Sequence, residues 1–205
     1  MALSGNLDEV TYFISTALLL FLVIDPLGNI PLFLTATRNI SSSRRQWVIA
    51  RELLIALGIM VAFFFVGSWF LGILHITQPA MAIGGGLILM FIAVRMVFPG
   101  ASSPLIEDVT GEPLIVPMAV PYVAGPSILA TEVILVHQSQ SQWPLLLAAL
   151  GTAWLVASII LFCSGFLHRV FGDRGITALE RLMGMVLVLI SAQMLLDGIK
   201  DFFNL

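Results

Sequence analysis

The chain has 205 residues, of which 59% are hydrophobic and 10% are charged, and its formal net charge at pH 7 is −3. Soluble domains carry about a quarter charged residues, so this composition excludes an ordinary soluble domain and indicates a membrane protein. The single cysteine, Cys163, excludes an internal disulfide framework.

Six segments are long and apolar enough to cross a bilayer, which takes about 20 mostly apolar residues. A linker at 99–112, rich in Gly, Ser, Pro and acidic side chains, separates residues 1–98 from residues 113–205. The sequence therefore predicts an all-α polytopic membrane protein, a single membrane domain with three helices in each half. The predicted spans are residues 10–36, 48–73, 78–98, 114–137, 144–167 and 178–199.

The two halves are predicted to be inverted repeats. Three spans is an odd number, so the second half enters the membrane from the side opposite to the first. A shift of about 98 residues overlays Gly86 on Gly184 and Met96 on Met194. The same shift brings Gly28 onto Pro126 and Asn29 onto Ser127.

The distribution of positive charge predicts the orientation, because Lys and Arg near span ends stay in the cytoplasm. With the N-terminus outside, eight of the nine basic residues fall at inner ends and loops, and only Lys200 stays outside. We therefore expect both termini on the outer, periplasmic side and the linker 99–112 in the cytoplasm. The eight inner residues are Arg38, Arg44, Arg45, Arg51, Arg95, Arg169, Arg174 and Arg181.

The first span contains a cluster of residues that interrupt a helix near its middle. Pro26 and Pro31 break the backbone hydrogen bonding, and Gly28 gives the chain freedom to turn. A charged Asp25 would cost about 2.5–3.5 kcal/mol at the bilayer centre even on a lenient scale, so it must face protein or water or be protonated. Asn29 is suited to cap a second half-helix. The alternative is a proline kink that only shapes packing.

The fourth span carries a second interruption, from Pro121 to Ser127. Gly125, Pro126 and Ser127 are predicted to open a half-helix, since proline fits an early helical position and serine can cap or bind a ligand. Such a terminus attracts carboxylates. A kink is again the alternative. Glu132, five residues further on, could carry a coupling proton or could reach the outer interface.

Enzymatic and metal-binding patterns are missing from the sequence. His75, His137 and His168 stand at separate span ends without metal-ligand spacing, and no nucleotide-binding fingerprint occurs. We therefore expect neither catalysis nor a cofactor, and any pumping would be secondary or depend on a partner. The sequence gives no indication of nucleic-acid binding.

The interrupted segments and their surroundings resemble the MarC family (UPF0056) of integral inner-membrane proteins of bacteria. The motifs that carry the resemblance are residues 25–31, 51–57, 117–127, 179–184 and 193–198, and together they extend over essentially the whole chain. The resemblance implies six spans in two inverted three-helix repeats and a relationship to the LysE superfamily, which includes SnatA-type transporters of small neutral amino acids. It also implies a substrate site between the interruptions, at Asp25, Gly28, Asn29, Gly125, Pro126 and Ser127.

The function expected from these features is secondary transport of small zwitterionic amino acids such as glycine and alanine, by alternating access. Coupling to protons or sodium is expected, with Asp25 and Glu132 as the candidate coupling residues. Two alternatives stay open: an exporter or channel for another small metabolite, and a non-transporting scaffold subunit. The expected partners are the lipid bilayer and the amino acid, and the sequence leaves open whether the chain forms a homo-oligomer.

Overall fold

The computed structural model describes residues 2–37, 40–98, 123–139 and 142–203, and the regular structure in these ranges is helical. Four of the helices are long and apolar enough to cross a membrane, namely α3, α4, α6 and α7. This architecture confirms an all-helical membrane protein. The helices are α1 (Ala2–Ile24), α2 (Ile30–Ala36), α3 (Ser42–Ile73), α4 (Gln78–Val97), α5 (Pro126–Gln138), α6 (Trp143–Phe162) and α7 (Ser164–Phe203).

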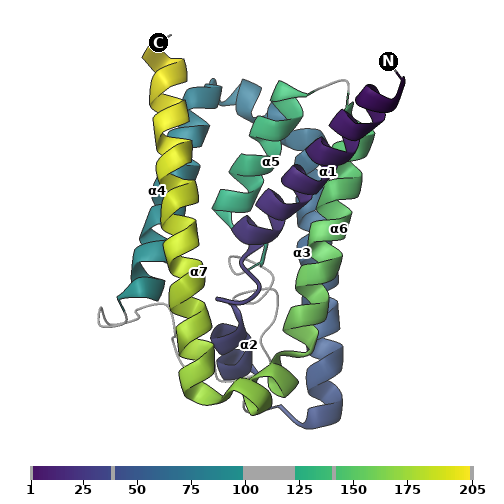
Figure 1. Ribbon diagram of the computed structural model, residues 1–205, viewed down its shortest axis with the longest axis vertical. Coiled ribbons are helices and arrows are strands. Elements are labelled where there is room, and N and C mark those ends of the chain that lie inside the picture. The colour runs from purple at the N-terminus through teal and green to yellow at the C-terminus, as the bar shows by residue number, and fades with distance from the viewer. Residues whose placement is uncertain (1, 38–39, 99–122, 140–141, 204–205) are drawn as a thin grey trace.

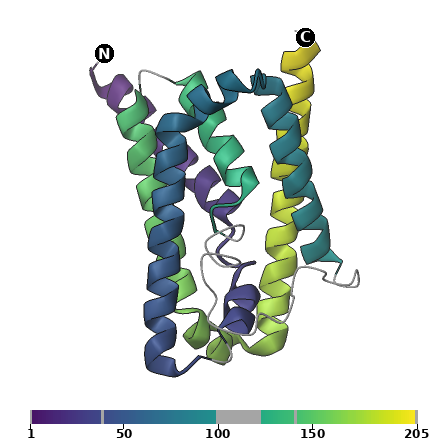
Figure 2. The ribbon, with the colours of Figure 1, turned by 180° about the vertical axis from the view of Figure 1, so that it is seen from behind.

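The long helices run side by side along the longest axis of the molecule, whereas α1 and α5 extend only from one end to about its middle (Figure 1). The view from behind shows the same arrangement (Figure 2). Both chain termini lie at the end from which α1 begins, and α2 lies in the other half. In chain order, α1 runs from this end to the middle of the molecule, and α5 runs from the middle back to the same end.

The interruption predicted within residues 10–36 is confirmed, because α1 ends at Ile24 and α2 begins at Ile30. Proline disfavours a right-handed helical conformation in the residue before it, and Pro26 follows Asp25. Asp25 instead has a φ of 49°, in the left-handed region. The local sequence thus ends α1 at this residue.

The fifth and sixth predicted spans differ from the observed helices. The helix predicted at 144–167 ends at Phe162, and α7 begins directly after Cys163. The sixth predicted span, 178–199, is only part of α7, in which the chain kinks at Gly172, with φ 63° and ψ 177°, and the helix then resumes. Glycine reaches positive φ without steric cost, so one residue is enough to change direction. The linker 99–112 and residues 114–122 of the fourth predicted span lie outside the described residues.

Helices α4 and α7 pack closely through glycines that make reciprocal contacts. A Cβ added to Gly86 would lie 3.1 Å from the Cβ of Met194, and one added to Gly184 would lie 2.8 Å from the Cβ of Met96. A shift of 98 residues turns one contact into the other. Reciprocal contacts are what a two-fold axis produces. They agree with inverted repeats, and the relation between the complete halves stays a prediction.

The main buried cluster joins α1, α2, α3, α5 and α6, with fully buried residues such as Phe33, Met60 and Leu161 at 0% exposure. Trp154 of α6 donates its indole N–H to the backbone oxygen of Leu53 on α3 at 2.9 Å. A second cluster, centred on Leu89 and Leu187, fills the space between α4 and α7. The broken segment of the first span lies between these two cores, because Ile24 belongs to one and neighbouring Leu27 packs on the other.

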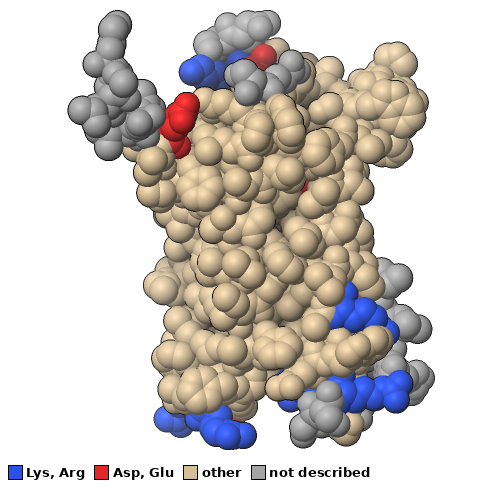
Figure 3. All heavy atoms as spheres, turned by 90° about the vertical axis from the view of Figure 1, so that its right-hand side faces the viewer, with Lys and Arg blue, Asp and Glu red and all other residues tan. Residues whose placement is uncertain are grey.

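One face of the molecule shows a wide band with few Lys, Arg, Asp or Glu side chains, and most of these side chains lie toward its two ends (Figure 3). Large apolar side chains are exposed along the long helices, among them Phe91 of α4 at 65% and Leu189 of α7 at 72%, as expected of a surface that faces lipid. Lys and Arg gather at the lower end in this view, opposite the chain termini. This asymmetry agrees with the charge count, and the sidedness in the membrane stays a prediction.

Candidate functional site

The first break is a tight turn organised by Asp25. The backbone N–H of Gly28 donates to Oδ1 of Asp25 at 3.1 Å, and the N–H of Asn29 donates to the Asp25 carbonyl at 3.1 Å. Aspartate supports such turns because its short carboxylate reaches the backbone a few residues on. Asp25 is only 6% exposed, so the turn holds a carboxyl group inside the protein. A buried carboxyl that keeps hydrogen-bonding capacity is a typical ligand-binding group.

Gly28 is required by the closeness of its neighbours. A Cβ on this residue would overlap Oδ2 of Asp25 and the terminal methyl group of Met96. Met96 belongs to α4, so the turn is in direct contact with the third long helix of the same half. The break is therefore packed against protein.

Asn29 does not cap α2 with its side chain as predicted. It is the N-cap residue, but its φ of −80° and ψ of −10° are helical, and its side chain makes no capping bond. A capping residue usually has an extended backbone that lets its side-chain oxygen reach forward. Here the side-chain N–H₂ of Asn29 donates backwards to the carbonyl of Ile24 at 2.9 Å. This bond pairs the last carbonyl of α1 and ties the two half-helices together.

The second break ends where α5 begins, with Gly125 as N-cap and Pro126 as the first helical residue, as predicted. Gly125 and Ser127 are buried, whereas Pro126 is exposed. The first backbone bond of the helix runs from Leu129 N–H to the Gly125 carbonyl at 3.2 Å. The amides of Ser127 and Ile128 precede this bond, so the helix itself offers them no acceptor. Pro121, predicted to contribute to this break, lies outside the described residues.

The end of α1 and the start of α5 lie side by side at mid-height in both ribbon views (Figures 1 and 2). The packing agrees, since residues on either side of both breaks belong to one buried cluster. Those next to the first break are Val23, Ile24 and Phe33, and those next to the second are Val123, Ala124 and Ile128. The fold thus brings together two interruptions that are about 100 residues apart in the sequence.

The two breaks offer complementary chemistry. Asp25 presents a carboxylate, which can accept hydrogen bonds from an ammonium group. The start of α5 presents backbone N–H groups and the positive end of a helix dipole, which favour a carboxylate. A small molecule with both charges matches this pair of features.

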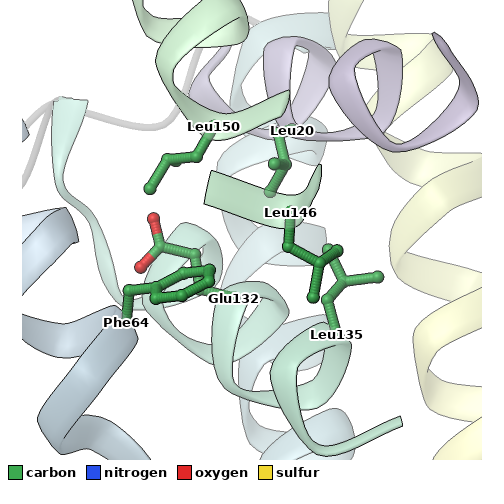
Figure 4. A pocket seen from close by; sticks show the side chains of 6 residues that line it. All are labelled: Leu20, Phe64, Glu132, Leu135, Leu146 and Leu150. Atoms are coloured by element: carbon green, nitrogen blue, oxygen red, sulfur yellow. The ribbon is translucent and has the colours of Figure 1, made fainter. Parts of the chain in front are cut away.

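Glu132 lies deep inside the protein, so the interpretation that it reaches the outer interface is wrong. Its side chain is 2% exposed and lines a small cavity (Figure 4). The carboxylate points between Phe64 and Leu150, and neither oxygen has a hydrogen-bond partner among the described residues. Sequence spacing alone placed Glu132 five residues beyond the break but could not show which side of α5 faces the protein.

Other polar contacts support the helices around the site. Arg51 and Glu52 form the intrahelical pair that their adjacency suggests, with Nη2 and Oε1 2.7 Å apart. Tyr12 of α1 donates its hydroxyl to Oγ of Ser139 at 2.9 Å, a link that no local sequence signal indicates. Within the described ranges, no group of three or more His, Cys, Asp or Glu side chains could hold a metal ion.

Comparisons with known proteins are consistent over almost the whole chain. A profile described as "MarC family integral membrane protein" matches residues 10–203. A "UPF0056 membrane protein" of Buchnera aphidicola subsp. Schizaphis graminum is 46% identical over 93% of the chain and 97% of the relative. The "UPF0056 inner membrane protein YhgN" of Escherichia coli K12 is 46% identical over 91% of the chain and 95% of the relative. A UPF0056 membrane protein of Chlamydia pneumoniae is 32% identical over 94% of the chain and 96% of the relative. No solved structure gives a significant match.

Proposed function

The chain belongs to the MarC family of integral membrane proteins, and from this premise and the geometry of its breaks we propose that it is a secondary transporter of small neutral amino acids. The observation that carries the proposal is the meeting of two interrupted helix ends at the middle of the protein. Interrupted helices that face one another are a recurrent substrate site of secondary transporters.

The substrate is held through its two charged groups. The amides of Ser127 and Ile128, with the dipole of α5, bind the carboxylate. Asp25 binds the ammonium group, since a carboxylate has about four lone-pair positions and the Gly28 amide occupies one of them. Gly125, Pro126 and Asn29 shape the backbone that carries these groups.

A small substrate fits the close packing of the first break. Gly28 leaves no room for its own Cβ between Asp25 and Met96. A site whose wall is packed this closely leaves little room for a substrate side chain, so it favours glycine and alanine over amino acids with large side chains.

Alternating access follows from two inverted repeats of three spans, which rock against each other around the site. The reciprocal contacts of Gly86 and Gly184 support this symmetry. The protein resides in the bacterial inner membrane, in agreement with the names of its Escherichia coli relatives. The gathering of Lys and Arg at the end opposite the termini supports a periplasmic position for both termini.

Flux into proteoliposomes tests the proposal. Wild-type protein is expected to give saturable uptake of labelled glycine or alanine, and a panel of unlabelled solutes identifies competitors. Asp25→Asn should lower the apparent affinity about tenfold or more, because a hydrogen bond to a charged group contributes about 1.5–3 kcal/mol. Asp201→Asn, at an exposed position near the end of α7, is the matched control and should leave flux unchanged. Flux no higher than in empty liposomes, or unchanged affinity in Asp25→Asn, contradicts the proposal.

A further inference from the structure

Glu132 is a buried carboxyl group that the substrate site does not use. It is 2% exposed, and neither Oε1 nor Oε2 has a hydrogen-bond partner among the residues described. An ionised carboxylate without partners in apolar surroundings is costly, and such a group takes a proton instead. Leucine would fill the same space without the cost of burying a carboxyl group. We therefore expect Glu132 to have a role other than packing.

The cavity at Glu132 is apolar on all sides. Its volume is about 10 Å³, at the lower limit of what holds one water molecule. The other lining residues are Leu20 of α1, Phe64 of α3, Leu135 of α5, and Leu146 and Leu150 of α6. The ionisable residues described on α5 and on the helices packed against it do not line the cavity: Asp8, Glu9 and Tyr12 on α1, Arg44, Arg45, Arg51 and Glu52 on α3, Arg95 on α4, and His137 on α5.

The cavity lies beside the proposed substrate site, on the side of the chain termini. Glu132 is five residues beyond Ser127, or about 7.5 Å along the helix axis, and Leu20 is five residues before Asp25. Further along the same two helices, the hydrogen bond between Tyr12 and Ser139 connects α1 to α5. The carboxyl therefore lies between the breaks and a contact that closes this end of the helix pair.

We propose that Glu132 is a proton-binding site and that the transporter is coupled to protons rather than sodium. This inference rests on the proposed function of the two breaks. A hard metal cation requires several oxygen ligands, whereas the cavity offers the two oxygens of one carboxylate among hydrocarbon side chains. A proton needs only one of them.

The coupling follows from the change in surroundings during alternating access. While the cavity is apolar and shut off, as in the structure, the proposed site holds its proton. When α1 and α5 separate toward one side of the membrane, water enters the cavity and the proton passes from the carboxyl group to that water. When the site opens to the other side, a proton from the water of that side binds Oε1 or Oε2. Each transport cycle thus carries one proton across the membrane.

Glu132→Gln separates coupling from substrate binding, because the amide has nearly the same shape but cannot release a proton. In proteoliposomes, this variant should keep the exchange of labelled for unlabelled alanine and lose accumulation driven by a pH gradient. Glu9→Gln, at an exposed position on α1, is the control and should accumulate alanine as the wild type does. Gradient-driven accumulation by Glu132→Gln at the wild-type level overturns the proton site.

Infrared difference spectroscopy tests the same residue without any substrate. The wild type should show a protonated carboxyl band that changes with pH and is lost in Glu132→Gln. If that variant does not fold, Glu132→Asp should shift the band instead. A wild-type band that is unaffected by either substitution, or by pH, overturns the proton site. Absence of amino acid flux together with a titrating Glu132 band would reject the proposed function and leave the proton site in place.

Discussion

Asp25 is the residue on which the first break depends. It has a positive φ, which costs about 1–3 kcal/mol for most residues other than glycine and is best tolerated by Asn and Asp. Its side chain recovers part of this cost by accepting the Gly28 amide. Strain held in place by surrounding structure is typical of binding sites. The same carboxylate therefore shapes the turn and faces the proposed ligand.

Gly28→Ala is expected to damage the site without removing any polar group. Its Cβ would overlap Oδ2 of Asp25 and the methyl group of Met96, so the turn must shift. We expect the free energy of unfolding to fall by about 1–3 kcal/mol, as for other overpacked positions, and alanine uptake to be lost. Thermal unfolding in detergent and proteoliposome flux measure the two effects.

Gly58→Ala on α3 is the matched control, since no atom lies within 4 Å of the added Cβ. Alanine is favoured over glycine inside a helix by about 1 kcal/mol, so this variant should be unchanged or slightly more stable. Equal behaviour of Gly28→Ala and Gly58→Ala would show that the first break tolerates rearrangement and would remove the packing argument.

Single residues show where sequence analysis succeeds and where it stops. Pro26 and Gly28 have strong local preferences, which is why the first break could be predicted. The direction of the Asn29 side chain depends on the carbonyl of Ile24, five residues earlier, to which it donates, and the burial of Glu132 depends on three other helices. Neither is encoded in local spacing.

At the scale of elements, the α4–α7 pair gives the sharpest test of the symmetry between halves. Gly86→Ala and Gly184→Ala would each press a Cβ against the opposite helix, with nearest atoms at 3.1 Å and 2.8 Å. Both should lower the free energy of unfolding by similar amounts, about 1–3 kcal/mol. Gly84→Ala meets no atom within 4 Å and should not. Thermal unfolding of the three variants is the measurement, and destabilisation by only one of the pair would contradict reciprocal packing.

The hydrogen bond between Tyr12 and Ser139 should couple the ends of α1 and α5. In a double-mutant cycle of Tyr12→Phe and Ser139→Ala, we expect an interaction energy of about 0.5–1.5 kcal/mol, the usual net contribution of a hydrogen bond. Thermal or denaturant unfolding provides the four free energies. Additive effects would mean that the bond does not hold these helix ends together.

Elements also show why hydropathy alone misplaces boundaries. The span predicted at 144–167 is apolar beyond the end of α6, so composition cannot reveal that the helix ends at Phe162. The kink at Gly172 comes from the backbone conformation of this single residue, which hydropathy does not describe. Packing between helices decides where the chain turns within an apolar run. The sequence of one segment carries no information about that packing.

At the scale of the molecule, charge and topology predict the same orientation. Both termini lie at one end and Lys and Arg gather at the other (Figures 1 and 3). Basic residues remain in the cytoplasm, so tags at both termini should be accessible from the periplasm. A protease added to intact spheroplasts checks this, with inverted vesicles as the control. Cleavage only in inverted vesicles would reverse the orientation.

The central claim is that the two breaks form one amino acid site. Cysteine protection tests it directly: Asn29→Cys and Ser127→Cys are made separately, each with exposed Cys163 replaced by serine, and alkylated with a maleimide. We predict that alanine slows alkylation at both positions with the same half-saturating concentration, because one bound molecule covers both. Protection at neither position, or at concentrations that differ between them, would contradict a shared site.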